Sequence, residues 1–508
     1  MARLAFPFLV VRLGRPVHWA LVCLALVSFP CTSSAVRGRY EIGDWVSWTS
    51  MRQVNDIEEY LNVLYVASDG GVARYDLMTH RWKKPLTVAD GLMARRVLAI
   101  HLDPVTADLI YRTPQGIGSF SLLGERDNAW FKPTPEIEQQ LTPSDPSRPY
   151  PNAIPPPGYH FQGGLLIDRD LREYPVIDKA VDFWGNTWLG IRSLGVAVIE
   201  WNTLQMRLLA YGLWNDDVRA LDRQGDTFWF VGPSAINTYD RYNDTWDKFE
   251  AFNIYDLHSD DVRDVLIDST FVWLATSDGL SRYDRVGDRW RTFTRFDGLP
   301  DSDVRTLAAD SGSLWVGTRF GMARLDRATS RVTDVSRGSF GERTVNDIGI
   351  IDTAVWVGTS LGLERTLDRG KTWTRFTADE PILDAAIYVI AVHGDELWCA
   401  TRLGIIGYNT KLGRAERLPA GIYFGADSIG GQRKQVHSLL VVDSLLWVGT
   451  DEGIARYDRR TGYSRNFSTE DGLIDNRVFD IELDGDCLWF ATPGGVTRFY
   501  WNNPYRID

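Results

Sequence analysis

The sequence is short of the residues that build disulfide frameworks. It contains four cysteines in 508 residues, and two of them lie close to the N-terminus. The other two, Cys399 and Cys487, are separated by two units of the repeat described below. A disulfide needs Cα atoms within about 7 Å of each other. We therefore expect two buried thiols that pack as small apolar groups, and a fold stabilised by packing alone.

Histidine and positive charge are also scarce. The seven histidines are scattered, so the sequence offers neither a zinc-ligand spacing nor a Ser/His/Asp arrangement. No acidic loop has the spacing of a calcium site. A formal net charge of -12 argues against the basic face that a nucleic-acid partner requires. We expect no catalytic residue, no metal, no cofactor and no nucleic acid.

The N-terminus carries an apolar run, Trp19 to Phe29, that is only about half the length needed to cross a bilayer. Arginines precede it and small residues follow it, so residues 1–35 are predicted to be a secretory signal cleaved after Ala35. A lipid anchor on Cys31 is the alternative, and Pro30 fits it poorly. We expect a secreted or periplasmic protein with no membrane insertion after cleavage.

Aromatic residues are abundant, and they recur in one phrase. With 20 Trp, 20 Tyr, 22 Phe and 44% apolar residues, the chain can build a large core. The best copies of the phrase begin at Leu314 (LWVGTRFGMARLD), Leu446 (LWVGTDEGIARYD), Val272 (VWLATSDGLSRYD) and Val355 (VWVGTSLGLERTLD). Poorer copies begin at Leu64, Ile110, Trp188, Trp229, Trp398 and Trp489. The period of about 41 to 49 residues is that of one four-stranded propeller blade.

Each copy predicts strands for local reasons. The Leu-Trp-Val run is apolar on both faces, as a strand between neighbouring blades must be. A glycine such as Gly321 then supplies the positive φ of a tight turn, and Asp326 opens the next turn through bonds to its own backbone. An outer strand with aromatics follows, and a strand led by a valine such as Val304 lies innermost. Four strands per unit are thereby predicted.

The phrase resembles the two-component regulator propeller repeat, which occurs in extracellular sensor domains of bacterial hybrid histidine kinases and in some secreted propellers. The resemblance covers roughly residues 45 to 500 and implies ligand sensing outside the cytoplasm, often of glycans. The sequence contains no membrane helix, kinase or DNA-binding segment after the repeats, so we expect a propeller that stands alone. A sialidase-type Asp box occurs once, at Thr366 to Trp373, and is interpreted as a stabilised turn.

The termini are predicted to complete one blade together. The last repeat stops near Tyr500, and Gly43 to Ser50 (GDWVSWTS) reads as an orphan outer strand. We expect an all-β propeller of about ten blades over residues 36–508, as one ring closed by the N-terminal strand, with two smaller rings as the alternative. A proline-rich insertion at 132–159 is predicted to be a loop, functional or inert, and residues 159–176 to form an additional hairpin.

Two sets of residues are candidate ligand contacts. Three successive repeats begin their innermost strands with Asp-Val-Arg, which places three pairs near the central channel: Asp217 and Arg219, Asp261 and Arg263, Asp303 and Arg305. These groups could bind sugars, carboxylates or peptides, or they could simply pair between adjacent blades. The second set comprises the turn tips on the same face: Ser277, Asp278, Arg319, Phe320, Arg402, Asp451 and Glu452.

These observations favour an exported binding or sensing module, or a protein-interaction module, over an enzyme. Its expected partners are a glycan, a peptide or an envelope protein. The alternative is an extracellular glycan-active hydrolase or lyase that uses two channel carboxylates.

Overall fold

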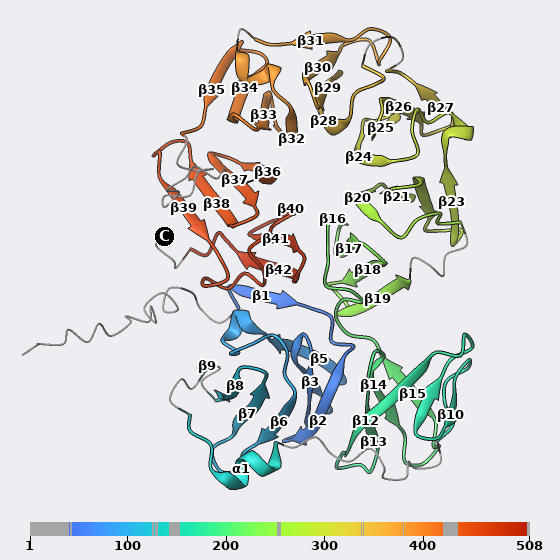
Figure 1. Cartoon of the computed structure of the whole chain (residues 1–508), viewed down its shortest axis with the longest axis vertical. Helices are drawn as coiled ribbons and strands as arrows, with labels where there is room; N and C mark the ends of the chain where they lie inside the picture. Colours follow the sequence, from blue (N-terminus) through green and yellow to red (C-terminus); the bar gives the residue numbers. More distant parts are fainter. Residues whose placement is uncertain are drawn as a thin grey trace, which may run out of the picture.

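The computed structural model describes residues 40, 43–123, 126–127, 131–141, 153–250, 256–336, 338, 340–378, 380–419 and 435–504. The predicted signal peptide and Cys31 lie outside these residues. The described chain forms ten antiparallel sheets, nine with four strands and one with six, and this confirms the all-β propeller-type fold (Figure 1). No helix in the described part of the chain is long and apolar enough to cross a membrane.

One blade shows how the repeat phrase folds. Its second strand carries Trp315, which is fully buried. The turn after this strand places Gly321 at φ +88, where a β-carbon would meet the hydroxyl of Ser336 at 2.3 Å. The next turn is held by Asp326, whose carboxylate accepts the backbone N–H groups of Ala328 and Thr329. The residue types of the phrase are therefore explained by burial, positive φ and turn bonding.

Seven blades, in chain order, contact one another around a ring. Their strands are β16 (Ala220–Gln224), β17 (Thr227–Gly232), β18 (Ala235–Asp240), β19 (Thr245–Glu250), β20 (Val262–Ile267), β21 (Phe271–Thr276), β22 (Gly279–Asp284), β23 (Arg289–Phe293), β24 (Val304–Ala309), β25 (Ser313–Thr318), β26 (Met322–Asp326), β27 (Val332–Asp334), β28 (Val345–Ile351), β29 (Ala354–Thr359), β30 (Gly362–Thr366), β31 (Thr374–Phe376), β32 (Ile387–His393), β33 (Glu396–Thr401), β34 (Gly404–Asn409), β35 (Arg414–Arg417), β36 (Val436–Val442), β37 (Leu445–Thr450), β38 (Gly453–Asp458), β39 (Ser464–Phe467), β40 (Asp480–Asp484), β41 (Cys487–Thr492) and β42 (Gly495–Tyr500).

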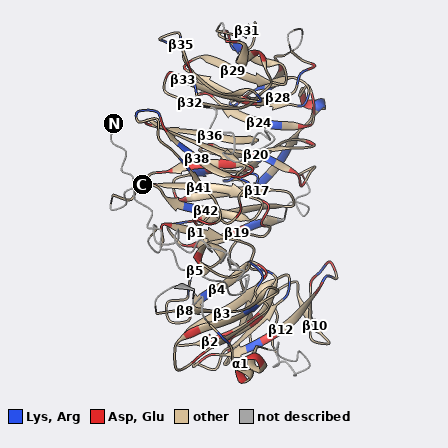
Figure 2. Ribbon diagram, turned by 60° about the vertical axis from the view of Figure 1, so that its left-hand side comes forward, with Lys and Arg blue, Asp and Glu red and all other residues tan. Residues whose placement is uncertain are grey.

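Three further blades form an arc, with β2 lying between β6 and β12. Their strands are β2 (Val54–Tyr60), β3 (Val63–Ser68), β4 (Gly71–Asp76), β5 (Arg81–Leu86), β6 (Ala99–Leu102), β7 (Asp108–Thr113), β8 (Gly116–Ser121), β9 (Arg126–Asp127), β10 (His160–Gln162), β11 (Leu165–Ile167), β12 (Glu173–Val181), β13 (Thr187–Ile191), β14 (Gly195–Ile199) and β15 (Met206–Leu209). Short 3-10 turns cover Val88–Asp90, Arg295–Asp297 and Pro381–Asp384. Figure 2 shows the ring and the arc as two stacks that meet near β1, β5 and β19.

The predicted single ring of ten blades is wrong, because the ring closes on seven. Its first blade packs directly against its last one: the backbone N–H of Val218 donates to the carbonyl of Thr492 at 3.0 Å. The N–H of Leu221 also donates to the carboxylate of Asp480 at 3.0 Å. A repeat period cannot show this, since it gives the number of blades and not which of them meet. The alternative of two smaller rings is closer to the structure, but only the seven blades close into a ring and the other three form an open arc.

The predicted joining of the two termini in one blade is confirmed. Strand β1 (Trp45–Trp48) pairs antiparallel with β42 and becomes the outer strand of the last blade. Trp45 stacks on Phe499 at a centroid distance of 4.0 Å, and Trp48 stacks on Trp489 at 5.2 Å. The N-terminal strand therefore closes the ring through both hydrogen bonds and aromatic packing.

The described parts of the insertion pack on the arc. Helix α1 (Pro135–Gln140) is followed by Leu141, which is buried against Ala99 and Ile110 of the β6–β9 blade. At the other end, Ile154 is bonded alongside residues 204–206, next to β15. The predicted hairpin at 159–176 is confirmed as β10 and β11, which extend the sheet of β12 to six strands. Residues 142–152 lie outside the described part.

The two cysteines of the repeats do not form a disulfide with each other. Cys399 and Cys487 are free thiols as expected, but Cys487, the first residue of β41, is only half-buried. Burial raises the pKa of the Cys399 thiol well above its usual value.

The Asp box is a stabilised turn, since the carboxylate of Asp368 accepts hydrogen bonds from the backbone N–H groups of Lys371 and Thr372.

Candidate ligand-binding site at the channel rim

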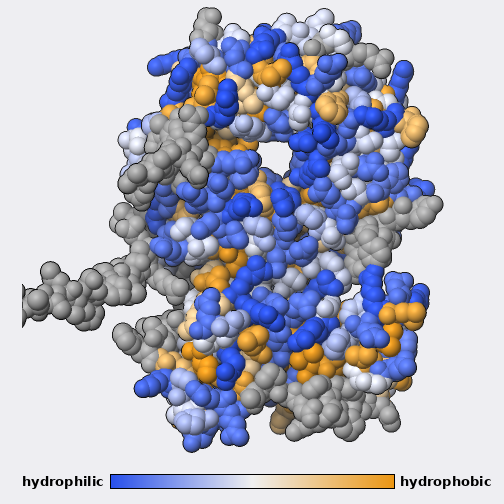
Figure 3. Space-filling model, in the orientation of Figure 1, coloured by the Kyte–Doolittle hydropathy of each residue, from blue (hydrophilic) through white to orange (hydrophobic). Residues whose placement is uncertain are grey.

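The wall of the ring's channel consists of seven innermost strands, each of which contacts the next. Near its start each strand carries a buried aliphatic residue, such as Val262 or Val304, and several strands then contain a β-bulge. The residue after the aliphatic one is at least partly exposed in all seven blades. These seven rim residues are Arg219, Arg263, Arg305, Asn346, Tyr388, His437 and Phe479. The space-filling view shows an opening through the ring at its centre (Figure 3).

The structure brings the three predicted Asp-Val-Arg pairs onto adjacent blades. The guanidinium of Arg219 lies 2.7 Å from the carboxylate of Asp217, and that of Arg263 lies 3.0 Å from the carboxylate of Asp261. In each of these pairs the two residues belong to the same blade and are two positions apart. The three arginine side chains remain 31% to 41% exposed.

One arginine also joins neighbouring blades. Arg263 forms an ion pair with Asp303 of the next blade, and Arg305 lies 3.5 Å from the same carboxylate. The interpretation of the triplet as inter-blade pairing therefore applies to Arg263. The described contacts of Arg219 and Arg305 include no such pair with another blade's carboxylate, although both arginines retain a partner aspartate.

Three of the other four rim residues are aromatic, which sequence reasoning missed. The guanidinium of Arg219 lies over the ring of Phe479, 4.4 Å from its centroid. Phe479 in turn meets His437 edge to face at 5.4 Å. Tyr388, one blade further, is 41% exposed. Burial lowers the pKa of the His437 imidazole. The sequence could have revealed these residues, because each occupies the same position in its repeat as the three arginines do in theirs.

The turn tips share the face of the rim, as predicted. The N–H of Arg319 donates to the carbonyl of Asp303 at 2.8 Å, and the N–H of Ser277 donates to that of Asp261 at 3.2 Å. Phe320 lines a separate cavity of about 790 Å³ together with Arg295 and Arg343. Arg402 lies in the corresponding turn between β33 and β34 and is exposed. Asp278, Asp451 and Glu452 occupy equivalent turns.

A second missed feature is a set of carboxylates that hold the blades together. In four blades of the ring, an aspartate lies one or three positions after the rim residue. Its carboxylate accepts hydrogen bonds from two backbone N–H groups. Asp347 accepts from Ile348 at 2.8 Å and, in the next blade, from Ile390 at 2.7 Å. The same arrangement recurs at Asp222, Asp264 and Asp480. These side chains therefore bridge blade to blade through the backbone.

Burial raises the pKa of these bridging carboxyl groups. The hydrogen bonds that they accept from backbone N–H groups lower the pKa, but by less. The pKa of Asp222, Asp347 and Asp480 rises to about 6, and that of Asp264 rises well above its usual value. Glu482, on the same innermost strand as Asp480, has its pKa raised to about 8 by burial and by neighbouring carboxylates. The bridging oxygens already hold backbone groups, so we interpret these aspartates as structural.

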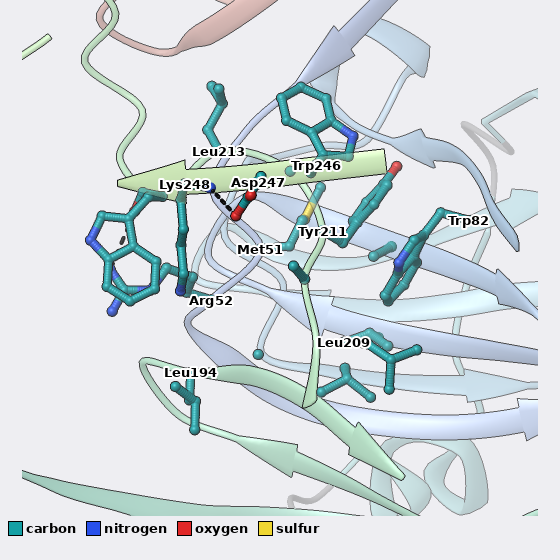
Figure 4. Close-up of a pocket in the computed structure, with 17 residues that line it drawn as sticks. Met51, Arg52, Trp82, Leu194, Leu209, Tyr211, Leu213, Trp246, Asp247 and Lys248 are labelled. Atoms are coloured by element: carbon teal, nitrogen blue, oxygen red, sulfur yellow. Dashed lines mark hydrogen bonds between the residues drawn. The ribbon is translucent and has the colours of Figure 1, made fainter. Parts of the chain in front are cut away.

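The joint between the ring and the arc contains a narrow cavity (Figure 4). Its free volume of about 30 Å³ is room for water and too little for a ligand. Trp82 of the arc stacks on Tyr211 at 4.2 Å, and both rings lie side by side in Figure 4. Trp214 lies between Arg52 and Lys248, whose cationic groups are 2.9 Å and 3.1 Å from its ring centroid. We interpret this joint as packing.

No model of a known protein family matches the sequence, and no curated protein matches it. Similar solved structures include the extracellular domain of the proposed one-component system BT4673 of B. thetaiotaomicron, at 16% identity and a TM-score of 0.46, covering 90% of this chain and 71% of that one. The extracellular domain of the proposed hybrid two-component system BT3049 from the same bacterium has 15% identity and a TM-score of 0.44, with coverages of 87% and 61%.

PorZ, a surface component of the type-IX secretion system of Porphyromonas gingivalis, has 13% identity and a TM-score of 0.34, with coverages of 90% and 87%. Similarity at these TM-scores does not carry a function across, so the proposal below rests on the channel rim.

Proposed function

We propose that the chain is an exported ligand-binding or sensing module, and that its ligand binds at the rim of the seven-bladed ring. The observation that supports this is the set of rim residues. Three arginines occupy one side of a single opening, and Tyr388, His437 and Phe479 occupy consecutive blades on the other. Packing between blades requires neither charge nor an aromatic ring at this position, because the buried aliphatic residue before it supplies that packing.

The two halves of the rim suit one class of ligand. Arginine forks bind carboxylates, phosphates and vicinal hydroxyls, and aromatic rings bind the apolar face of a ring-shaped group. An anionic or polyhydroxylated ligand, such as an acidic glycan, could contact both halves. A peptide or an envelope protein with an acidic segment is the alternative partner.

A three-residue variant tests the proposal. We expect the parent to bind at least one ligand on an array of acidic and neutral glycans, and Arg219→Gln with Arg263→Gln and Arg305→Gln together to abolish that binding. The melting temperature should fall only moderately, since glutamine keeps a donor to the aspartate of each pair. As a matched control, Arg289→Gln changes an exposed arginine of an outer strand and should leave binding intact.

Two results would contradict the site. If the triple variant binds as well as the parent, the ligand contacts another surface. If the variant loses most of its stability and the surviving fold still binds, the arginines serve blade pairing alone.

We also propose that the protein is not an enzyme. The bridging aspartates hold backbone N–H groups, which leaves Glu482 as the channel carboxyl with a raised pKa and no backbone partner among the described bonds. Incubating the parent with its array ligand should release no product. Product formation that Glu482→Gln abolishes would favour the hydrolase or lyase alternative.

Export is proposed from the predicted signal peptide. Expressed in a bacterial host, the full chain should appear in the periplasm or medium with an N-terminus at residue 36. Recovery of the uncleaved chain from the cytoplasm would contradict this proposal.

A further inference from the structure

A groove lies in the arc, between the blade of β2–β5 and the blade of β10–β15. Its volume is about 340 Å³, which is within the range of small-ligand pockets. Met78 and His80 line it from the turn between β4 and β5, and Trp184 lines it from the turn between β12 and β13. Glu200 lines it from the start of the neighbouring turn between β14 and β15, and Arg207 lines it from β15.

Aromatic side chains gather at this groove without being buried. Trp184 is 43% exposed, and its neighbours Phe183 and Trp201 are 86% and 64% exposed. Phe183 and Trp184 meet edge to face at 6.1 Å. A β-carbon built on Gly185 would lie 3.7 Å from Trp201, so that indole covers the glycine of the turn. Three large rings therefore occupy one small surface.

The turn that carries Phe183 and Trp184 is rigidly braced. The buried carboxylate of Asp182 accepts the N–H groups of Trp184 and Asn186, both at 2.9 Å, and the indole N–H of Trp188 at 3.0 Å. The side chain of Asn186 accepts the N–H of Trp201 at 3.2 Å. Phe183 and Trp184 are thus presented by a preorganised turn, which reduces the entropy lost when a ligand binds.

The corresponding turns of other blades show that the fold does not require aromatic residues after the bracing aspartate. Asp268 and Asp310 brace the corresponding turns of two other blades, which are one residue shorter, and each likewise accepts backbone N–H groups and the indole N–H of the repeat tryptophan. The residues after those aspartates are Ser-Thr and Ser-Gly, whereas Phe-Trp follows Asp182. Serine, threonine and glycine suffice for the turn, so the exposed Phe-Trp pair has no structural cause in it.

We propose that this groove binds a pyranose unit of a neutral glycan. The C–H face of a pyranose is apolar and stacks on an exposed indole, and its hydroxyls both donate and accept hydrogen bonds. His80, Glu200 and Arg207 offer both kinds of partner around Trp184, and their opposite charges give no preference for an anion. The groove is on the arc and not on the ring, so this inference is independent of the function proposed for the rim.

Calorimetric titration of the mature chain with cellohexaose, maltohexaose and xylohexaose tests the groove. We expect at least one of these sugars to bind, Trp184→Ala to weaken that binding at least about tenfold, and Trp184→Phe to stay within about threefold of the parent. Tyr242→Ala is the control, because Tyr242 is an 81% exposed aromatic on a turn of the ring. It should bind as the parent does, and all three variants should keep the parent's melting temperature.

The outcomes separate the groove from the rim. The triple arginine variant should retain hexasaccharide binding in full. The inference is overturned if none of the three sugars binds, or if Trp184→Ala binds as well as the parent. Loss of binding in the arginine variant alone would place the sugar at the rim and would also overturn the inference. A parent that self-associates, with Trp184→Ala monomeric and no sugar bound, would show that the rings form a protein contact instead.

Discussion

Replacing Asp347 by asparagine should make the protein more stable at pH 8 and leave it nearly unchanged at pH 4. The carboxylate of Asp347 bridges two blades and takes its pKa from burial, which raises it from 3.8 to about 6. A raised pKa in the folded state means that folding favours the protonated group. Its stabilising contribution is complete below pH 3.8 and is lost as the pH rises through about 6.

The size of the effect follows from the shift. Two pKa units correspond to about 3 kcal/mol at a pH above both values. An amide has the shape of a protonated carboxyl group, and its oxygen can still accept one of the backbone N–H groups of Ile348 and Ile390. We therefore expect the Asp347→Asn variant to unfold within about 1 kcal/mol of the parent at pH 4. At pH 8 it should gain up to about 3 kcal/mol.

Urea unfolding followed by tryptophan fluorescence at both pH values measures this difference. The control is Asp368→Asn, in the turn of the Asp box. Hydrogen bonds from Thr372 lower the pKa of Asp368 to about 2, so its contribution is present above pH 3.8 and is lost only as the pH falls through 2. That variant should be less stable than the parent by a similar amount at pH 4 and pH 8. An Asp347→Asn protein that is clearly less stable than the parent at pH 8 would refute the reasoning, because the carboxylate would then stabilise the ring in its charged form.

Three further predictions concern the fold. Trp315→Ala should cost about 3 to 5 kcal/mol in urea unfolding, because the indole is fully buried; a loss under about 1 kcal/mol would contradict the blade assignment. Deleting residues 36–53 removes β1, so amide exchange in β41 and β42 should accelerate; unchanged protection would mean that β1 does not close the ring. Trp214→Ala should loosen the joint held by Arg52, seen as faster proteolysis between ring and arc, and equal cleavage rates would count against that role.

The repeat phrase predicted the blades but not their grouping. Burial of Trp315 and the positive φ of Gly321 are properties of one repeat, so a single copy contains their cause. The pairing of β1 with β42 could be predicted because an incomplete last blade needs a partner strand. The contact of the first ring blade with Asp480 depends on how far each blade rotates from the last, and no residue pattern in one repeat encodes that angle.

The candidate site was predicted in part for a similar reason. Identical Asp-Val-Arg triplets stand out in a sequence, so Arg219 and its two equivalents were found. Tyr388, His437 and Phe479 share the position in the repeat but not the residue type, so no repeated motif marks them in the sequence. The bridging aspartates were missed because their partners are backbone groups of the neighbouring blade, which carry no sequence signal.

A crystal structure of the mature chain with its array ligand tests the central proposal most directly. We predict that the ligand lies in the ring opening, with polar atoms within about 3.2 Å of the guanidinium groups of Arg219 and Arg305 and a ring or apolar face on Phe479 or Tyr388. A ligand bound anywhere else on the ring, with the three arginines contacting only their aspartates, would contradict the proposal that the rim is the binding site.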